Sequence, residues 1–318
     1  MLRLGDPSSV SCGPSCFEMA TVDFRNFVYR MTKKNIFYYF LIITVSILLF
    51  SCNTKHRIWV GKGTEQKIFN LKYGEHKKQN LDIFLPPYYT PDTPVVMLVH
   101  GGFWKFGRKQ KMIQIQNFLH RHRIPTVNIN YRLVSKRHKI TYREQLQDIG
   151  MAIQKFNSLS ANADLMRDHY ILLGESSGAH LALLYGYRNP DQVKKIISLS
   201  GPSDFYSEKY LNSLYSRYTS PTIEDVVGER FDRKNFSEKF KEASPISQIT
   251  PVPTLIFQGA RDPLVHKNQG IALDSALSAM EIPHRFIFMA GTGHTPRLYS
   301  KKKRDSIILP SILEWIQN

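Results

Sequence analysis

The sequence has very little cysteine, and none after residue 52. Its three cysteines are Cys12, Cys16 and Cys52. The rest of the chain therefore has no disulfide, no thiolate nucleophile and no cysteine-based metal site. Cys12 and Cys16 could form a C-x-x-x-C metal or redox pair, but no second pair of ligands lies near them in the sequence. We expect neither a metal nor an organic cofactor.

Clustered basic charge is also missing, although the formal net charge is +17. Lys and Arg are scattered along the chain, with short runs only at residues 108–111 and 301–304. Binding to nucleic acid requires clustered cations that neutralise phosphates, and it usually comes with a recognisable motif. Neither is present, so we expect a solvated basic surface and no nucleic-acid partner.

No apolar run is long enough for an ordinary membrane span. The longest, residues 36–50, has 15 residues, whereas a transmembrane helix needs about 20. It follows Lys33 and Lys34 and precedes Ser51 and Cys52. This layout is typical of a secretory signal peptide. An uncleaved signal anchor is the alternative.

The end of this run, Leu-Leu-Phe-Ser-Cys at residues 48–52, resembles the lipobox of bacterial lipoproteins. The resemblance implies a signal peptide at residues 31–51, a lipid on Cys52 and a linker at 52–65. It also implies a place in the bacterial cell envelope, outside the cytoplasm, with the membrane as a partner through Cys52. A start at Met31 would make residues 1–30 an upstream extension.

From residue 66 onward, patterns typical of strands and helices alternate. Short runs rich in Val, Ile and Leu, such as residues 95–99 and 195–199, indicate strands buried on both faces of a parallel sheet. Helical patterns lie between them, which predicts an α/β fold with a doubly wound, mostly parallel sheet. We expect one domain over 66–318, interrupted by a small helical cap at about 203–247.

A candidate nucleophile follows one of these strands. The segment Gly174-Glu-Ser-Ser-Gly178 comes directly after the apolar run 170–173 and opens a helical pattern. This is the context of the G-x-S-x-G nucleophile elbow, in which a sharp turn exposes the central serine. We therefore predict that Ser176, and not Ser177, is the nucleophile.

A serine hydroxyl needs a histidine to take its proton and a carboxylate to orient that histidine. Asp262 and His294 follow the last two predicted strands, in the chain order Ser, Asp, His that this elbow requires. An oxyanion intermediate also needs backbone N–H donors. The loop His100-Gly-Gly-Phe-Trp104 follows the strand at 95–99, so we expect donors from Gly102, Phe103 and Ser177, with Gly101 as a substitute.

At this point the sequence resembles the esterase/lipase branch of the α/β-hydrolases. The similar segments are Tyr73-Gly-Glu-His, Leu81-Asp-Ile-Phe-Leu-Pro86, His100-Gly-Gly-Phe-Trp104, Asn130-Tyr-Arg-Leu133, Gly174-Glu-Ser-Ser-Gly-Ala-His-Leu-Ala182 and Ala243-Ser-Pro-Ile246. Phe103 replaces the third glycine of hormone-sensitive-lipase-like members. His-Gly-Gly-aromatic-Trp is similar instead to kynurenine formamidases and the feruloyl-esterase-like group. The resemblance implies that Arg132 and Asp148 form a structural ion pair, and that Glu175 is a pocket-wall or surface residue.

These observations predict a serine carboxylic-ester hydrolase that acts through an acyl-enzyme on short-chain or aryl esters. An arylformamidase-like amide hydrolase using the same residues is the alternative, and a non-catalytic binding protein on a hydrolase scaffold is a third. The cap is rich in aromatics, and Tyr210, Leu214 and Tyr218 follow a helical i, i+4, i+8 spacing. We expect Trp104, Glu175, Tyr210 and Tyr218 to line the substrate pocket.

Overall fold

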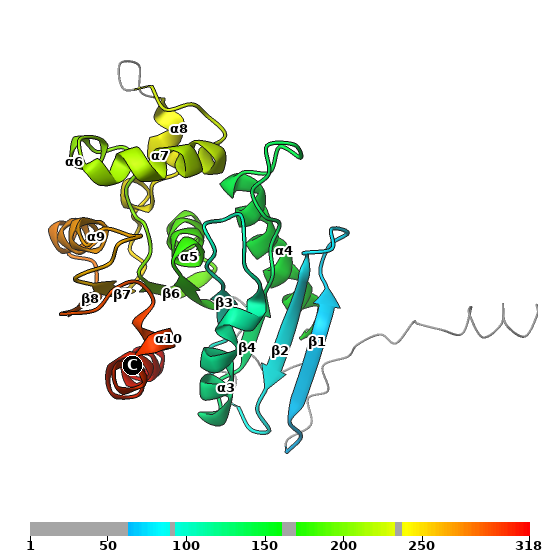
Figure 1. The fold of residues 1–318 in the computed structure, drawn as a ribbon. Helices are drawn as coiled ribbons and strands as arrows, with labels where there is room; N and C mark the ends of the chain where they lie inside the picture. The colour runs from blue at the N-terminus through cyan, green and yellow to red at the C-terminus, as the bar shows by residue number, and fades with distance from the viewer. Residues whose placement is uncertain (1–62, 90–92, 161–169, 233–236) are drawn as a thin grey trace, which may run out of the picture. The chain divides into compact units, whose positions relative to one another are not determined.

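The computed structural model describes residues 63–89, 93–160, 170–232 and 237–318 (Figure 1). The predicted upstream extension at 1–30, the signal peptide at 31–51 and the lipid on Cys52 lie outside the described residues. None of the helices in the described part has the length and hydropathy that a bilayer span requires.

An eight-stranded sheet forms the centre of the fold, in the order β1-β2-β4-β3-β5-β6-β7-β8. The first two strands pair antiparallel, β2 pairs antiparallel with β4, and all later neighbours pair parallel. The strands are β1 (Gln66–Lys72), β2 (Asn80–Leu85), β3 (Val96–Val99), β4 (Thr126–Ile129), β5 (Tyr170–Glu175), β6 (Val193–Leu199), β7 (Thr254–Gly259) and β8 (His284–Met289). The predicted mostly parallel sheet is confirmed.

Helices cover both faces of this sheet. The bounds are η1 (Lys109–Met112), α3 (Ile113–Arg121), α4 (Tyr142–Leu159), α5 (Ser177–Arg188), α6 (Glu208–Leu211), α7 (Leu214–Val227), α8 (Glu238–Glu242), η2 (Pro245–Ser247), α9 (Asn268–Ala279), α10 (Pro296–Tyr299), α11 (Lys301–Lys303), η3 (Arg304–Ile308) and α12 (Leu309–Gln317). Figure 1 shows α3 and α5 on opposite sides of the central strands, and α6, α7 and α8 grouped together as a cap.

Strand β3 shows how the sequence builds two cores. Val96 and Leu98 belong to one apolar cluster, together with residues of α3 and α12, whereas Met97 and Val99 belong to the other, together with residues of α4 and α5. Because side chains alternate along a strand, a continuous apolar run is buried on both faces. Because these strands are parallel, their carboxyl ends lie at one edge of the sheet. The candidate residues follow β3, β5, β7 and β8 at this edge.

Candidate active site

Ser176 lies at the turn between β5 and α5 in a conformation that is rare for a residue with a side chain. Its φ is 56° and its ψ is −123°. A non-glycine residue at positive φ is strained, and such strain collects at functional sites. The backbone N–H of Ser176 donates to the carbonyl oxygen of Leu199 at 2.8 Å. This bond fixes the elbow to the end of β6.

The two glycines of the motif allow the elbow to pack tightly. A Cβ atom on Gly174 would lie 2.2 Å from the carbonyl oxygen of Gly178, and one on Gly178 would lie 2.2 Å from that of Val99. Backbone atoms cannot yield as a flexible side chain can. Any larger residue would therefore push α5 away from β3 and β5, which explains the G-x-S-x-G spacing in physical terms.

Asp262 and His294 are brought together by the loops after β7 and β8. Nδ1 of His294 lies 2.7 Å from Oδ2 of Asp262. Oδ1 of Asp262 accepts from the backbone N–H groups of Leu264 and Val265, both at 2.9 Å. The carboxylate is fully buried, and the His294 side chain is 12% exposed. A carboxylate held in this way fixes the orientation of the imidazole ring.

No hydrogen bond joins Ser176 to His294 among the residues that the structure describes. Such bonds are often long without a substrate and shorten in the reactive complex. The arrangement places the predicted nucleophile, base and carboxylate at one edge of the sheet, after β5, β8 and β7 respectively. Their catalytic roles remain predictions that a reaction must test.

The loop after β3 lies directly against the elbow. A Cβ on Gly101 would come within 3.0 Å of Cβ of Ser176, so only glycine permits this approach. Gly102, Phe103 and Trp104 all have positive φ, at 142°, 52° and 59°. The turn is closed by the backbone N–H of Phe106, which donates to the carbonyl oxygen of Gly102 at 2.8 Å.

The predicted oxyanion donors lie on this loop and at the start of α5. Ser177 is the first residue of α5, and the first N–H groups of a helix have no partner within the helix. The buried Lys109, at the start of η1, joins the end of this loop to β1 and β2. Nζ of Lys109 donates to Oδ1 of Asn70 at 2.8 Å and to Oδ1 of Asn80 at 2.7 Å, and it pairs with Asp82 at 2.8 Å.

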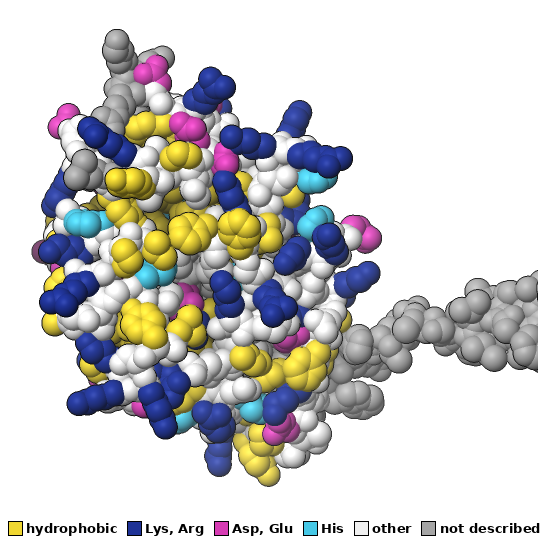
Figure 2. All heavy atoms as spheres, in the orientation of Figure 1, with side chains coloured by type: hydrophobic (Ala, Val, Ile, Leu, Met, Phe, Trp, Pro, Cys, Tyr) yellow, Lys and Arg dark blue, Asp and Glu magenta, His cyan; other side chains and the backbone are white. Residues whose placement is uncertain are grey.

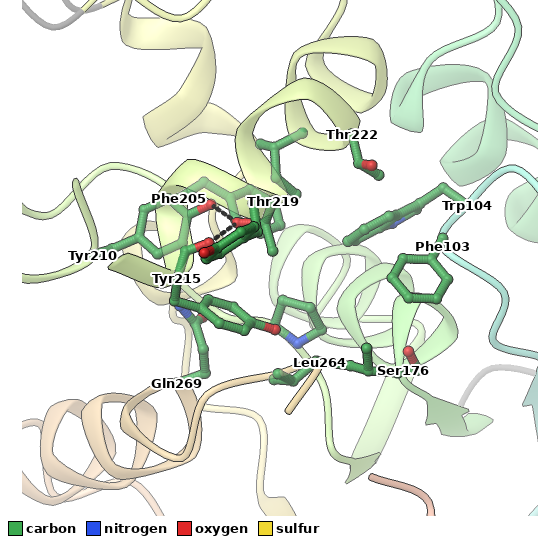
Figure 3. A pocket seen from close by; sticks show the side chains of 14 residues that line it. Phe103, Trp104, Ser176, Phe205, Tyr210, Tyr215, Thr219, Thr222, Leu264 and Gln269 are labelled. Atoms are coloured by element: carbon green, nitrogen blue, oxygen red, sulfur yellow. Dashed lines mark hydrogen bonds between the residues drawn. The ribbon is translucent and has the colours of Figure 1, made fainter. Parts of the chain in front are cut away.

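Ser176 opens into a mostly apolar pocket beneath the cap (Figure 3). The cavity has a volume of about 70 Å³, well below the roughly 300 Å³ at the lower end for drug-sized ligands. The predicted residues Trp104, Tyr210 and Tyr218 line it. Its other lining residues are Phe103, Ser176, Pro202, Phe205, Tyr215, Thr219, Thr222, Ile223, Leu264, Val265 and Gln269.

Two sequence-based expectations for the pocket are wrong. Glu175 does not line this cavity and is not on the surface, because its carboxylate is buried in an ion pair with Arg297, at 2.6 and 2.7 Å. The helical stripe through Tyr210 and Tyr218 is also interrupted. Ser213 caps a new helix by accepting from the N–H of Ser216, so Tyr210 lies on α6 and Tyr218 on α7.

Sequence reasoning missed Tyr215, Leu264 and Gln269 in the pocket wall. Gln269 comes from α9, and its Oε1 accepts from the backbone N–H groups of Ser203 and Asp204, both at 2.7 Å. It therefore joins the start of the cap to the domain. No motif marks these residues, since they meet only when the cap folds over the sheet.

His180 is a structural residue and not a rival base. Its Nδ1 accepts from Nε1 of Trp104 at 3.0 Å, and its Nε2 lies 2.8 Å from the carbonyl oxygen of Ala243. Burial lowers the pKa of His180 to about 4, so the ring is neutral and links the pocket wall to the end of the cap.

The expected pair of Arg132 and Asp148 is present at 2.7 Å. No cluster of His, Cys, Asp and Glu suited to a metal ion occurs in the described residues.

Known proteins resemble this chain over most of its described length. The model of the BD-FAE family matches residues 81–277. A kynurenine formamidase of Salmo salar is 27% identical over 150 residues, which are 45% of this chain and 48% of that protein. An isoprenylcysteine alpha-carbonyl methylesterase of Arabidopsis thaliana is 25% identical over 246 residues, 71% of this chain and 56% of its own. The chain thus spans about half the length of these relatives.

Solved structures share the fold. A truncated carbohydrate esterase from gut microbiota superimposes with a TM-score of 0.66 at 20% identity, covering 81% of this chain and 98% of its own. Esterase 2 of Thermogutta terrifontis, solved with propionate bound, superimposes with a TM-score of 0.62 at 15% identity, covering 79% and 93%. At such identities the likeness concerns the arrangement of the elements.

Proposed function

We propose that this chain, a member of the BD-FAE family with the α/β-hydrolase fold, hydrolyses short-chain or aryl carboxylic esters through an acyl-enzyme on Ser176. The observation that carries the proposal is the strained elbow, which directs Ser176 into a small apolar pocket. The hydrogen bond between Asp262 and His294 at the same sheet edge supports it.

In the reaction, Oγ of Ser176 attacks the ester carbonyl carbon while Nε2 of His294 takes the hydroxyl proton. Asp262 holds Nδ1 of that ring and stabilises the imidazolium that forms. The negative charge on the carbonyl oxygen is met by backbone N–H groups of the Gly102–Phe103 turn and of Ser177. His294 then returns its proton to the leaving alcohol, and the acyl group stays on Ser176. A water molecule, activated by His294, releases the acid.

The pocket favours small acyl groups. Its aromatic walls, Trp104, Tyr210 and Tyr215, occupy volume that a long flexible chain would need. We expect efficient hydrolysis of p-nitrophenyl acetate and butyrate and poor hydrolysis of chains beyond about ten carbons. Hydrolysis rates of p-nitrophenyl esters with acyl chains of about two to sixteen carbons, in steps of roughly two carbons, test this expectation. Activity that rises steadily to palmitate would contradict the proposal.

Formamide hydrolysis is the second candidate. It is favoured by the relatives named kynurenine formamidase and by Phe103 and Trp104 in the loop after β3, which form an aromatic wall of the pocket. The same attack on a formyl carbon would release an arylamine instead of an alcohol. Comparing kcat/KM for N-formylkynurenine and for an aryl acetate separates the two. The Ser176→Ala variant is the control for both.

We also propose that the chain is held in the bacterial cell envelope by a lipid on Cys52. The support is the sequence alone: Lys33 and Lys34, the apolar run 36–50 and the lipobox-like end. Labelling cells with a palmitate analogue should mark the wild-type protein and leave Cys52→Ala unmarked. A membrane-bound, unlabelled protein that retains Lys33 would support an uncleaved signal anchor instead.

A further inference from the structure

More than half of the large exposed apolar side chains of the described residues lie on segments that carry pocket-lining or triad residues. Ten large hydrophobic residues are exposed, and six of them lie on the four segments that surround Ser176. We call these six the apolar rim: Phe103, Phe106, Tyr218, Leu264, Leu298 and Tyr299. Their exposed fractions run from 41% to 84%. Soluble proteins rarely leave a large contiguous apolar patch uncovered unless it binds something.

The rim is continuous with the pocket. Phe103, Tyr218 and Leu264 line the cavity together with Ser176. The rim residue Tyr299 lies close to the loop of His294. A Cβ on Gly293 would be 3.2 Å from the hydroxyl oxygen of Tyr299. Figure 2 shows one face of the molecule on which hydrophobic side chains gather in the middle, with Lys and Arg around them. Any layer that covers the rim therefore also covers the entrance to the nucleophile.

The exposed charge on these segments is positive, and the nearest acidic residues, Glu224, Asp225 and Asp305, lie just beyond their ends. Residues 101–112, 214–222, 259–268 and 291–304 contain a single acidic residue, Asp262, and it is buried. The same segments carry exposed cations: Arg108, Lys111, Arg217, Arg261, Lys267, Lys301 and Lys302. The surface therefore combines apolar side chains with an excess of positive charge.

We propose that the apolar rim docks on an anionic lipid bilayer, so that Ser176 faces the lipid surface and takes its ester from there. Aromatic and aliphatic side chains surrounded by Lys and Arg match the two requirements of interfacial binding, which are apolar insertion and attraction to anionic headgroups. A protein partner seated on the rim would close the pocket mouth. A bilayer instead supplies esters dissolved in its outer layer directly to the pocket.

Hydrogen exchange of the full chain tests the docking without relying on total membrane attachment, which an N-terminal anchor would also produce. The chain is mixed with vesicles of phosphatidylcholine alone or of phosphatidylcholine with phosphatidylglycerol. Exchange is read on peptides covering residues 101–108 and 295–300. We expect protection of both peptides by the anionic vesicles. Equal exchange with and without anionic vesicles would overturn the proposal, as would equal protection by both kinds of vesicle.

Matched variants separate docking from catalysis. Leu298→Ser with Lys302→Gln removes one apolar side chain of the rim and one exposed cation of the same segment, neither of which lines the pocket. Met280→Ser with Lys194→Gln removes the same kinds of exposed group at the amino ends of β8 and β6, on the opposite edge of the sheet. We expect the rim variant to lose about fivefold or more in hydrolysis of an ester dispersed in anionic vesicles.

Hydrolysis of a water-soluble ester reports on the proposed function by itself. We expect both variants to hydrolyse p-nitrophenyl acetate within about twofold of wild type, since neither change reaches the reacting groups. An equal loss of the vesicle activity in both variants would overturn the docking role. Wild-type protection of the rim peptides without any esterase activity would retain the docking surface and reject the proposed function instead.

Discussion

The buried ion pair between Glu175 and Arg297 offers a sharp test of how the site is held. Glu175 directly precedes Ser176, and Arg297 lies three residues after His294. Nε and Nη2 of Arg297 donate to the two carboxylate oxygens at 2.6 and 2.7 Å, and both side chains are at most 4% exposed. Nη2 also donates to the carbonyl oxygen of Lys111 at 3.0 Å. One side chain thus joins the elbow, the histidine loop and η1.

Arg297→Met should therefore be strongly destabilising. It leaves the Glu175 carboxylate buried without the partner that both of its oxygens contact in the structure. Breaking a buried pair by removing one partner costs about 3–5 kcal/mol. For a domain of this size each kcal/mol lowers the melting temperature by about 2–4 °C. We expect a melting temperature roughly 6–20 °C below that of the wild type.

The double variant Glu175→Met with Arg297→Met is the matched control. Replacing both charges by apolar side chains removes the unpaired charge, so most of the lost stability should return. The assay is urea unfolding followed by circular dichroism for the wild type, both single variants and the double variant. A cost below about 1 kcal/mol for Arg297→Met, or a double variant no more stable than the single ones, would refute the reasoning.

Three further predictions concern buried histidines, a glycine of the elbow and a ring of the pocket wall. Burial lowers the pKa of His100 and His180 to about 4, while the unfolded chain titrates near 6.5, so the unfolded state binds more protons between these values. The free energy of unfolding should thus fall by about 3 kcal/mol per histidine as the pH drops from about 6.5 to 4, and a flat profile in urea titrations would contradict this. Gly178→Ala should lower the melting temperature strongly, because its Cβ would meet backbone oxygens at the end of β3, whereas Gly150→Ala, with only ordinary contacts, should be neutral or stabilising by up to about 1 kcal/mol. Tyr210→Ala should shift the preference in the p-nitrophenyl ester panel toward longer acyl chains, and an unchanged profile would remove this ring from the acyl site.

The sequence pattern was sufficient for the α/β-hydrolase fold and for the placement of the candidate residues. Apolar runs such as residues 170–173 are buried on both faces of the sheet. They indicate a parallel sheet regardless of the conformation of the connecting loops. The loops after the last two strands had to carry Asp262 and His294 to the edge where Ser176 lies. Local patterns were reliable here because topology, and not side-chain packing, fixes these positions.

Packing between distant segments could not be predicted in the same way. Glu175 and Arg297 lie 122 positions apart, and a glutamate beside a nucleophile gives no local sign of a buried partner. The expected stripe through Tyr210 and Tyr218 failed because a single capping serine, Ser213, starts a new helix. The apolar rim was likewise not predicted, since its members come from four separate segments.

The most direct test of the central claim is the position of a covalent phosphonate adduct. The full chain is treated with a fluorophosphonate, digested and mapped by mass spectrometry, with Ser176→Ala and Ser177→Ala treated in parallel. A serine activated by His294 reacts, and an ordinary hydroxyl does not. The adduct should lie on Ser176 in the wild type and in Ser177→Ala, and should be missing in Ser176→Ala. An adduct that persists in Ser176→Ala, or a wild type that does not react, would contradict the assignment of Ser176 as the nucleophile.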